Sequence, residues 1–162
     1  MDPVKPALLL VAWIGLLPLQ GLAQERSREQ TPWQPGAEPQ AWAVVRQSLV
    51  EKGPPQGLVQ RDWIFMRALD RPDLRAGEYL ADRQLDADTP GPVVGFTAVV
   101  LLQRPQQGEA WQVRERRMRA LCDQQRLQVL EASGEWVAYA GKPDPQAGAR
   151  LAWICSSAAT GS

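Results

Sequence analysis

The sequence predicts an α+β domain in which an antiparallel twisted sheet of about five or six strands follows an amphipathic helix. A C-terminal helix packs on one face of this sheet and is tethered to it by a disulfide. Three observations predict this class. Apolar residues recur at helical spacing near both ends of the domain, strand-like runs separated by short polar turns lie between them, and the chain has only two cysteines.

Residues 1–23 have the three-part layout of a secretory signal peptide. Lys5 precedes an uninterrupted apolar run from Ala7 to Leu17, and Gly21 and Ala23 are small residues of the kind a signal peptidase reads. The run is shorter than the roughly 20 residues that span a bilayer. We expect cleavage after Ala23, no stable membrane span afterwards, and a periplasmic, cell-surface or secreted protein. The alternative is an uncleaved membrane anchor.

The mature chain divides into three parts. Residues 24–40 are rich in Gln, Glu, Arg and Pro, which predicts a flexible N-terminus. Residues 41–156 are expected to form a single α+β domain, and residues 157–162 a frayed tail. Helical spacing of apolar residues predicts a helix over Glu38–Lys52, which glycine and two prolines then end. This helix either packs on the domain or docks on a partner, and we favour packing.

The first predicted strands are of unequal length. Trp63–Met66 is a short run of strand formers, and Glu78–Leu80 is a second short candidate after a turn-rich segment. Val93–Gln103 follows a strong turn sequence and carries apolar residues on both faces. This pattern predicts a central strand that is covered on each side for part of its length.

The second half of the sheet is expected to form a meander. Trp111–Cys122 fits both helical and strand spacing, and the preceding strand with its short loop containing Gly108 favours a strand. Further strands are predicted over Leu127–Leu130 and Trp136–Tyr139, joined by tight connections. Apolar residues at helical steps then predict a short helix over Gln146–Ser156.

Cys122 and Cys155 are predicted to form a disulfide, because two cysteines in an exported chain are usually paired. The bridge would pin the C-terminal helix to the sheet. It would close a loop whose chain entropy corresponds to about 3–4 kcal/mol of stability. The alternatives are two free thiols or a redox-active pair, and the wide spacing disfavours the latter.

Composition excludes several kinds of chemistry. Without histidine there is no Ser-His-Asp or Cys-His arrangement and no His-ligated metal site. No phosphate-binding loop is present, so we expect no cofactor and no metal. Lys plus Arg equals Asp plus Glu at 18 each, which argues against a nucleic-acid partner. A hydrolase using two carboxylates remains the least favoured alternative. Its candidate acids are Asp82, Asp86, Asp88, Glu109, Glu115 and Glu131.

A dense group of arginines is the candidate ligand patch: Arg114, Arg116, Arg117 and Arg119. In a strand, the first two project from one face and the last two from the other. Guanidinium groups pair bidentately with carboxylate and phosphate, so an anionic partner is one interpretation. The alternative, which we favour, is a structural role in which the stems cover apolar surface and the heads pair with nearby acids.

The segment Trp63–Cys155 resembles the surface-adhesin protein E-like domain of exported bacterial proteins. The residues that carry the resemblance are an early strand containing tryptophan, Glu78-Tyr79-Leu80 leading to Leu85, and a long apolar strand ending at Pro105. They continue with Leu121-Cys122-Asp123, Arg126-Leu127-Gln128-Val129-Leu130 and a last cysteine near the C-terminus. The resemblance implies a twisted antiparallel sheet whose concave face holds a C-terminal helix through a disulfide. The helix at Glu38–Lys52 lies outside it, and the segment between Tyr139 and Cys155 is shorter than the family pattern.

These observations lead to three functional expectations. The first is an exported, non-catalytic, adhesin-like binding module of the bacterial envelope that recognises a protein or an anionic surface ligand. The second is a structural or accessory envelope protein that acts through protein contacts. The carboxylate-dependent hydrolase is third. A deep cleft with two convergent acids would favour the hydrolase. An exposed groove beside the N-terminal helix would favour the accessory protein. Arginine and tryptophan at the rim of the sheet would favour the binding module.

Overall fold

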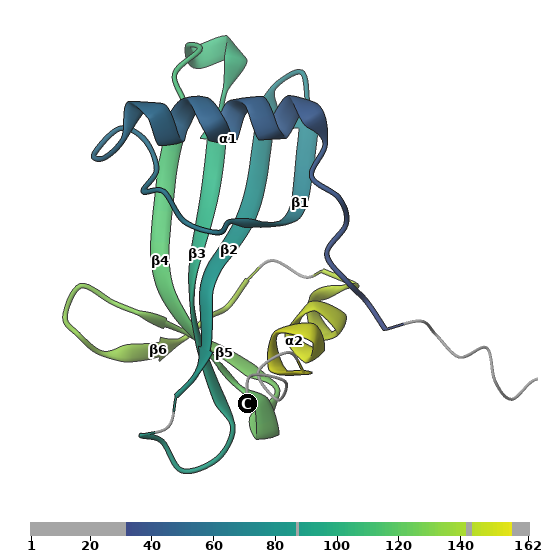
Figure 1. Cartoon of the computed structure of the whole chain (residues 1–162), viewed down its shortest axis with the longest axis vertical. Coiled ribbons are helices and arrows are strands. Elements are labelled where there is room, and N and C mark those ends of the chain that lie inside the picture. The colour runs from purple at the N-terminus through teal and green to yellow at the C-terminus, as the bar shows by residue number, and fades with distance from the viewer. Residues whose placement is uncertain (1–31, 87, 142–143, 157–162) are drawn as a thin grey trace, which may run out of the picture. The chain divides into compact units, whose positions relative to one another are not determined.

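The computed structural model describes residues 32–86, 88–141 and 144–156, and these confirm the predicted fold class. Six antiparallel strands form one sheet in the order of the sequence, with a helix before it and a helix after it (Figure 1). The predicted signal peptide, residues 24–31 and the predicted frayed tail lie outside the described residues. The elements are α1 (Gln40–Lys52), β1 (Ile64–Arg71), β2 (Leu74–Leu85), β3 (Val93–Gln103), β4 (Gln112–Leu121), β5 (Arg126–Leu130), β6 (Trp136–Ala138) and α2 (Ala147–Ser156).

The main differences from the sequence prediction concern the length of the first strands. Strand β2 runs over Leu74–Leu85, well beyond the predicted Glu78–Leu80, and β1 continues to Arg71. Both extensions are rich in charged residues whose side chains lie at the sheet surface, so hydrophobic alternation does not reveal them. Helix α1 begins at Gln40 rather than Glu38, because Pro39 has an extended backbone with ψ of 141°.

The first hydrophobic core, which we call the α1 cluster, lies between α1 and one face of the sheet. Trp42 and Leu49 project from α1 onto residues of β2 and β3, and all of these side chains are buried. Leu58, from the segment that follows the helix, completes the core. The members of the α1 cluster are Trp42, Leu49, Leu58, Tyr79, Val99 and Leu101.

The second core, the α2 cluster, lies on the opposite face of the same sheet. Successive side chains of a strand point to opposite faces, so β3 contributes Val94 and Phe96 here while Val99 and Leu101 belong to the α1 cluster. This confirms the prediction that the central strand is covered on both sides. The members of the α2 cluster are Leu80, Val94, Phe96, Met118, Ala120, Val129, Leu151 and Ile154.

A glycine in β2 allows α1 to lie close to the sheet. A Cβ atom at Gly77 would lie 2.6 Å from the Trp42 ring, closer than real side chains approach. The same ring packs edge to face against Trp111 at a centroid distance of 5.6 Å. The Arg75 guanidinium lies 5.3 Å from both ring centroids and is paired with Asp70 at 2.9 Å. Aromatic packing and cation–π contacts therefore join α1, β2 and the start of β4.

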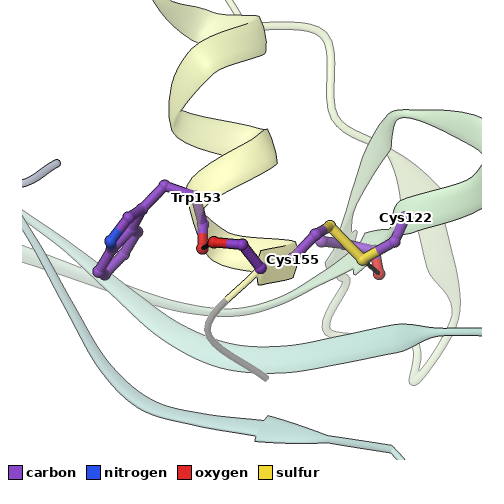
Figure 2. The surroundings of a disulfide bond; sticks show 5 residues. Cys122, Trp153 and Cys155 are labelled. Atoms are coloured by element: carbon purple, nitrogen blue, oxygen red, sulfur yellow. Dashed lines mark hydrogen bonds between the residues drawn. A yellow bond between two sulfur atoms is a disulfide. The ribbon is translucent and has the colours of Figure 1, made fainter. Parts of the chain in front are cut away.

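Helix α2 is joined to the sheet by the predicted disulfide. Cys155, in the last turn of α2, is bonded to Cys122 just after β4, with the two Cα atoms 5.8 Å apart. Figure 2 shows the Trp153 ring on the far side of Cys155 from this bond. That ring packs edge to face with Trp33 at 5.8 Å and lies 4.0 Å from the Arg83 guanidinium. Nothing in the sequence pattern indicates the contact with Trp33.

Ion pairs hold the other end of α2. Asp144 accepts a hydrogen bond from the backbone N–H of Gln146 and pairs with Arg150 and Arg67. Arg67 also holds Glu78 across the β1–β2 pair at 2.7 Å. The start of α2 is thus linked to the edge strand β1, and its end to the connection between β4 and β5.

The edge of β4 is only partly covered. Strand β3 pairs with β4 over Gln112–Leu121, whereas β5 pairs with β4 only over Met118–Leu121. In Figure 1, β5 and β6 turn away across one end of the sheet and leave β4 as its border at the other end. Among the described residues, no backbone hydrogen bond from a turn or loop reaches Gln112–Arg117. This six-residue segment is a free strand edge.

Candidate ligand-binding groove

A groove of about 550 Å³ lies beside this free edge, between β4 and the segment that follows α1. Its volume is in the range of small-ligand sites. The lining comes from two regions that are far apart in the sequence. The lining residues are Lys52, Pro55, Gln56, Ala110, Trp111, Gln112, Val113 and Arg114.

The electrostatic character of the groove is positive. Lys52 and Arg114 are its charged lining residues, and no acidic side chain lines it. Lys52 makes no ion pair with any other described residue, and Arg114 donates only to the amide oxygen of Gln112, at 3.3 Å. Two cations therefore lie in the lining of one groove that contains no carboxylate. An anion is the complementary ligand.

One wall of the groove is held in place by the α1 cluster. Trp111 and Val113 pack against that cluster, and Trp111 contacts both Trp42 and Arg75. These contacts fix the tryptophan side chain before any ligand arrives. A wall that is already ordered lowers the side-chain entropy that the protein loses when a ligand binds.

The opposite wall is a tight turn that ends α1. The N–H of Gly53 bonds to the carbonyl of Leu49, and the N–H of Leu58 returns to the same carbonyl at 2.8 Å. A Cβ atom at Gly57 would lie 2.0 Å from that oxygen, so only glycine fits there. The turn places Pro55 and Gln56 opposite β4.

The predicted arginine patch divides between the two faces of the sheet, as strand alternation requires. Arg114 and Arg116 lie opposite Val100 and Ala98, on the α2 face, while Arg117 lies opposite Thr97 on the α1 face. Arg119, also on the α1 face, donates to Gln128 at 2.6 Å and covers the Trp136 ring. Only Arg114 lines the groove. Whether the four arginines bind a ligand stays a prediction.

Two of the candidate acids do come together, on the α1 face. Arg61 pairs with both Asp82 and Glu115, and the buried Thr97 hydroxyl donates to Asp82 at 3.1 Å. One guanidinium thus stands between the two carboxylates, and neither acid lines the groove. The other candidates, Asp86, Asp88, Glu109 and Glu131, lie in connections between strands.

Two groups near the start of α1 have shifted pKa values. Arg46 holds Glu38 through two hydrogen bonds of 2.9 Å, and these lower the pKa of Glu38. Burial, assisted by a hydrogen bond with Glu38, raises the pKa of Tyr79. The Tyr79 hydroxyl also donates to the carbonyl of Trp42 at 3.4 Å. These groups anchor the helix that carries Lys52.

The groove was not evident from the sequence. No sequence motif marks Lys52, Pro55, Gln56 or Trp111 as site residues, and only the fold brings them together. One sequence pattern could have pointed to the groove: Lys52, in the last turn of a predicted helix, is followed by a rigid Gly-Pro-Pro turn. Within the described ranges, no group of three Cys, Asp or Glu side chains could hold a metal ion. No helix in the same part of the chain is long and apolar enough to span a bilayer.

Comparisons with family models, curated proteins and solved structures found no match to this chain. The resemblance to the surface-adhesin protein E-like family therefore stays a prediction from the sequence. What can be said of the site comes from its own residues.

Proposed function

We propose that this chain is an exported, non-catalytic binding module of the cell envelope that holds an anionic partner in the groove beside β4. The observation that carries the proposal is that Lys52 and Arg114 both line the groove, whereas no acidic residue lines it. Trp111 adds an aromatic surface that is already fixed by its packing against Trp42. Cation and tryptophan at the border of a sheet are the combination expected of a binding module.

Export is supported by the leader-like sequence of residues 1–23 and by the disulfide. Disulfides persist in oxidising compartments such as the periplasm and the cell surface. The bridge joins residues 33 positions apart and fastens a short helix to the sheet. A staple of this kind suits a small domain that works outside the cytosol.

A non-catalytic role is supported by the state of the acidic residues. Asp82 and Glu115 are paired with Arg61, so neither is presented to the groove. A glycoside hydrolase needs two carboxyl groups that flank a bound substrate. The polar side chains that line the groove in the described part of the chain are cations and amides, not carboxylates.

The proposal is tested by binding to poly-L-glutamate at two salt concentrations. We expect the Lys52→Gln/Arg114→Gln double variant to lose at least about tenfold in affinity at low salt, because both unpaired cations are removed. The Arg71→Gln/Arg126→Gln variant is the matched control, since it removes the same charge from exposed positions outside the groove lining. Equal losses in the two variants would show that net charge, rather than the groove, attracts the polymer.

A second candidate is an accessory protein that contacts its partner through α1. It is favoured by Val44, which is 59% exposed on the outer side of the helix, and by Val59, which is 40% exposed. Val44→Lys should then abolish capture of the partner and leave poly-L-glutamate binding unchanged. If Val44→Lys leaves capture intact, this candidate fails.

A further inference from the structure

The free edge of β4 has a defined set of outward-facing backbone groups. Alternate residues of an antiparallel strand bond to opposite neighbours. The N–H of Cys122 bonds to the carbonyl of Pro92, the residue just before β3, and the β3–β4 register has no shift. The backbone groups of the even-numbered residues of β4 therefore face β3. Those of Val113, Glu115 and Arg117 face outward, along the edge that β5 leaves free.

The side chains around this edge are mainly basic. Arg114 and Arg116 project on the α2 face, two residues apart and therefore roughly 7 Å from each other. Arg116 and Arg117 are exposed and have no side-chain partner among the described residues, while Glu115 is already paired with Arg61. A second copy of the same edge would place arginine against arginine, which is unfavourable. Charge complementarity selects an acidic strand.

We propose that an extended acidic segment of a partner protein pairs with Gln112–Arg117 as an additional strand of the sheet. This inference rests on the proposed function and specifies its partner. Backbone hydrogen bonds to Val113, Glu115 and Arg117 supply a contact that does not depend on sequence. Acidic side chains at alternate positions meet Arg114 and Arg116. The side chains between them point toward the α1 face, where Val113 and Trp111 line the groove.

The alternation gives a sequence requirement. Along a strand, side chains at positions i and i+2 share a face, so acids at these positions match the two arginines of the α2 face. The residue that flanks the acid opposite Arg114 lies across from Val113, so an apolar side chain there fits beside Trp111, Val113 and Pro55, which form the apolar part of the groove. The preferred segment therefore alternates acidic and apolar residues over about six positions. A polysaccharide or polyphosphate would match the charge but not the backbone groups.

The probe is a capped synthetic hexapeptide of alternating aspartate and valine, titrated into the full chain. We expect Arg117→Pro to weaken peptide binding about 3- to 10-fold more than Arg117→Gln, since both remove one charge and only proline removes an outward N–H. Circular dichroism establishes whether the proline variant is folded. Equal affinities of the two folded variants would overturn the edge-pairing inference.

A second measurement does not depend on the proline variant. Two versions of the peptide are compared, one N-methylated at every aspartate and the other at every valine. Only one of the two loses the N–H groups that face β4. We expect one methylated peptide to lose at least about tenfold in affinity, through several lost hydrogen bonds, and the other to bind as before. Hydrogen exchange should slow at the amides of Val113, Glu115 and Arg117. Equal binding by both methylated peptides would overturn the inference.

The outcomes separate this inference from the proposed function. If inorganic polyphosphate and the peptide bind equally well, and both are insensitive to Arg117→Pro, the groove recognises charge alone and strand addition is wrong. If neither polyphosphate nor peptide binds the unmodified chain, the proposed function fails as well. If two copies of the chain instead pair with each other through β4, the edge serves self-association and the inference of a partner segment is wrong.

Discussion

Helix α1 meets its face of the sheet through a buried tryptophan seated on a glycine, whereas α2 meets the opposite face through two buried aliphatic residues and a sulfur bridge. Leu151 and Ile154 are the residues of α2 that are buried in the α2 cluster. α1 buries Trp42 and Leu49, and Trp111 and Arg75 extend its contacts. Aromatic burial thus holds α1 without a covalent link, whereas α2 combines a smaller apolar contact with a disulfide.

The largest expected effect concerns the tryptophan of the α1 cluster. Trp42→Ala should lower the free energy of unfolding by about 3–5 kcal/mol, since it leaves a cavity over Gly77 and removes the support of Trp111. Urea denaturation measures the loss. Trp136→Ala, which removes a half-buried ring near the opposite border of the sheet, should cost about 1 kcal/mol or less. A loss at Trp42 no greater than at Trp136 would contradict the role given to α1.

Removal of the disulfide should have the next largest effect. In the Cys122→Ala/Cys155→Ala variant, the free energy of unfolding should fall by about 3–4 kcal/mol, because the unfolded chain regains the entropy of a 33-residue loop. Hydrogen exchange should accelerate in α2 more than in α1. Uniform acceleration in both helices would show that the bridge does not hold α2 specifically.

The close contact between α1 and β2 gives a smaller effect. Gly77→Ala should cost about 1–3 kcal/mol of unfolding free energy, since the new methyl group would overlap the Trp42 ring. A double-mutant cycle supplies the control. In a Trp42→Ala background, Gly77→Ala should cost much less, because the ring is gone. If Gly77→Ala lowers the unfolding free energy equally in that background, the glycine is required by the backbone of β2 and not by the Trp42 ring.

The smallest effect is a pH dependence at the start of α1. The Arg46 hydrogen bonds lower the pKa of Glu38 below its usual 4.5, so this pair stabilises the fold fully above pH 4.5 and is lost as the pH falls through the folded-state pKa. The stability difference between the unmodified chain and Glu38→Gln should therefore be fully present at pH 7 and shrink as the pH falls below 4.5. A difference that grows on acidification would contradict the sign.

The sequence allowed the fold class to be predicted because β3 and both helices follow clear hydrophobic periods. It did not predict the full length of β2, where Arg75 and Gln84 occupy strand positions as polar residues. The cysteine pair was predictable from the count of two cysteines and the leader-like sequence of residues 1–23. The groove was not, because Lys52 and Trp111 are 59 residues apart and meet only after α1 has packed on the sheet. The free edge of β4 depends on where β5 stops pairing, which no local pattern encodes.

Chemical-shift mapping tests the binding groove most directly. On addition of poly-L-glutamate to the full chain, we predict that the largest changes occur at Lys52–Gln56 and Trp111–Arg114, including the Trp111 indole N–H. Changes concentrated instead around Arg119 and Trp136, or spread evenly over all exposed arginines, would contradict a groove beside β4.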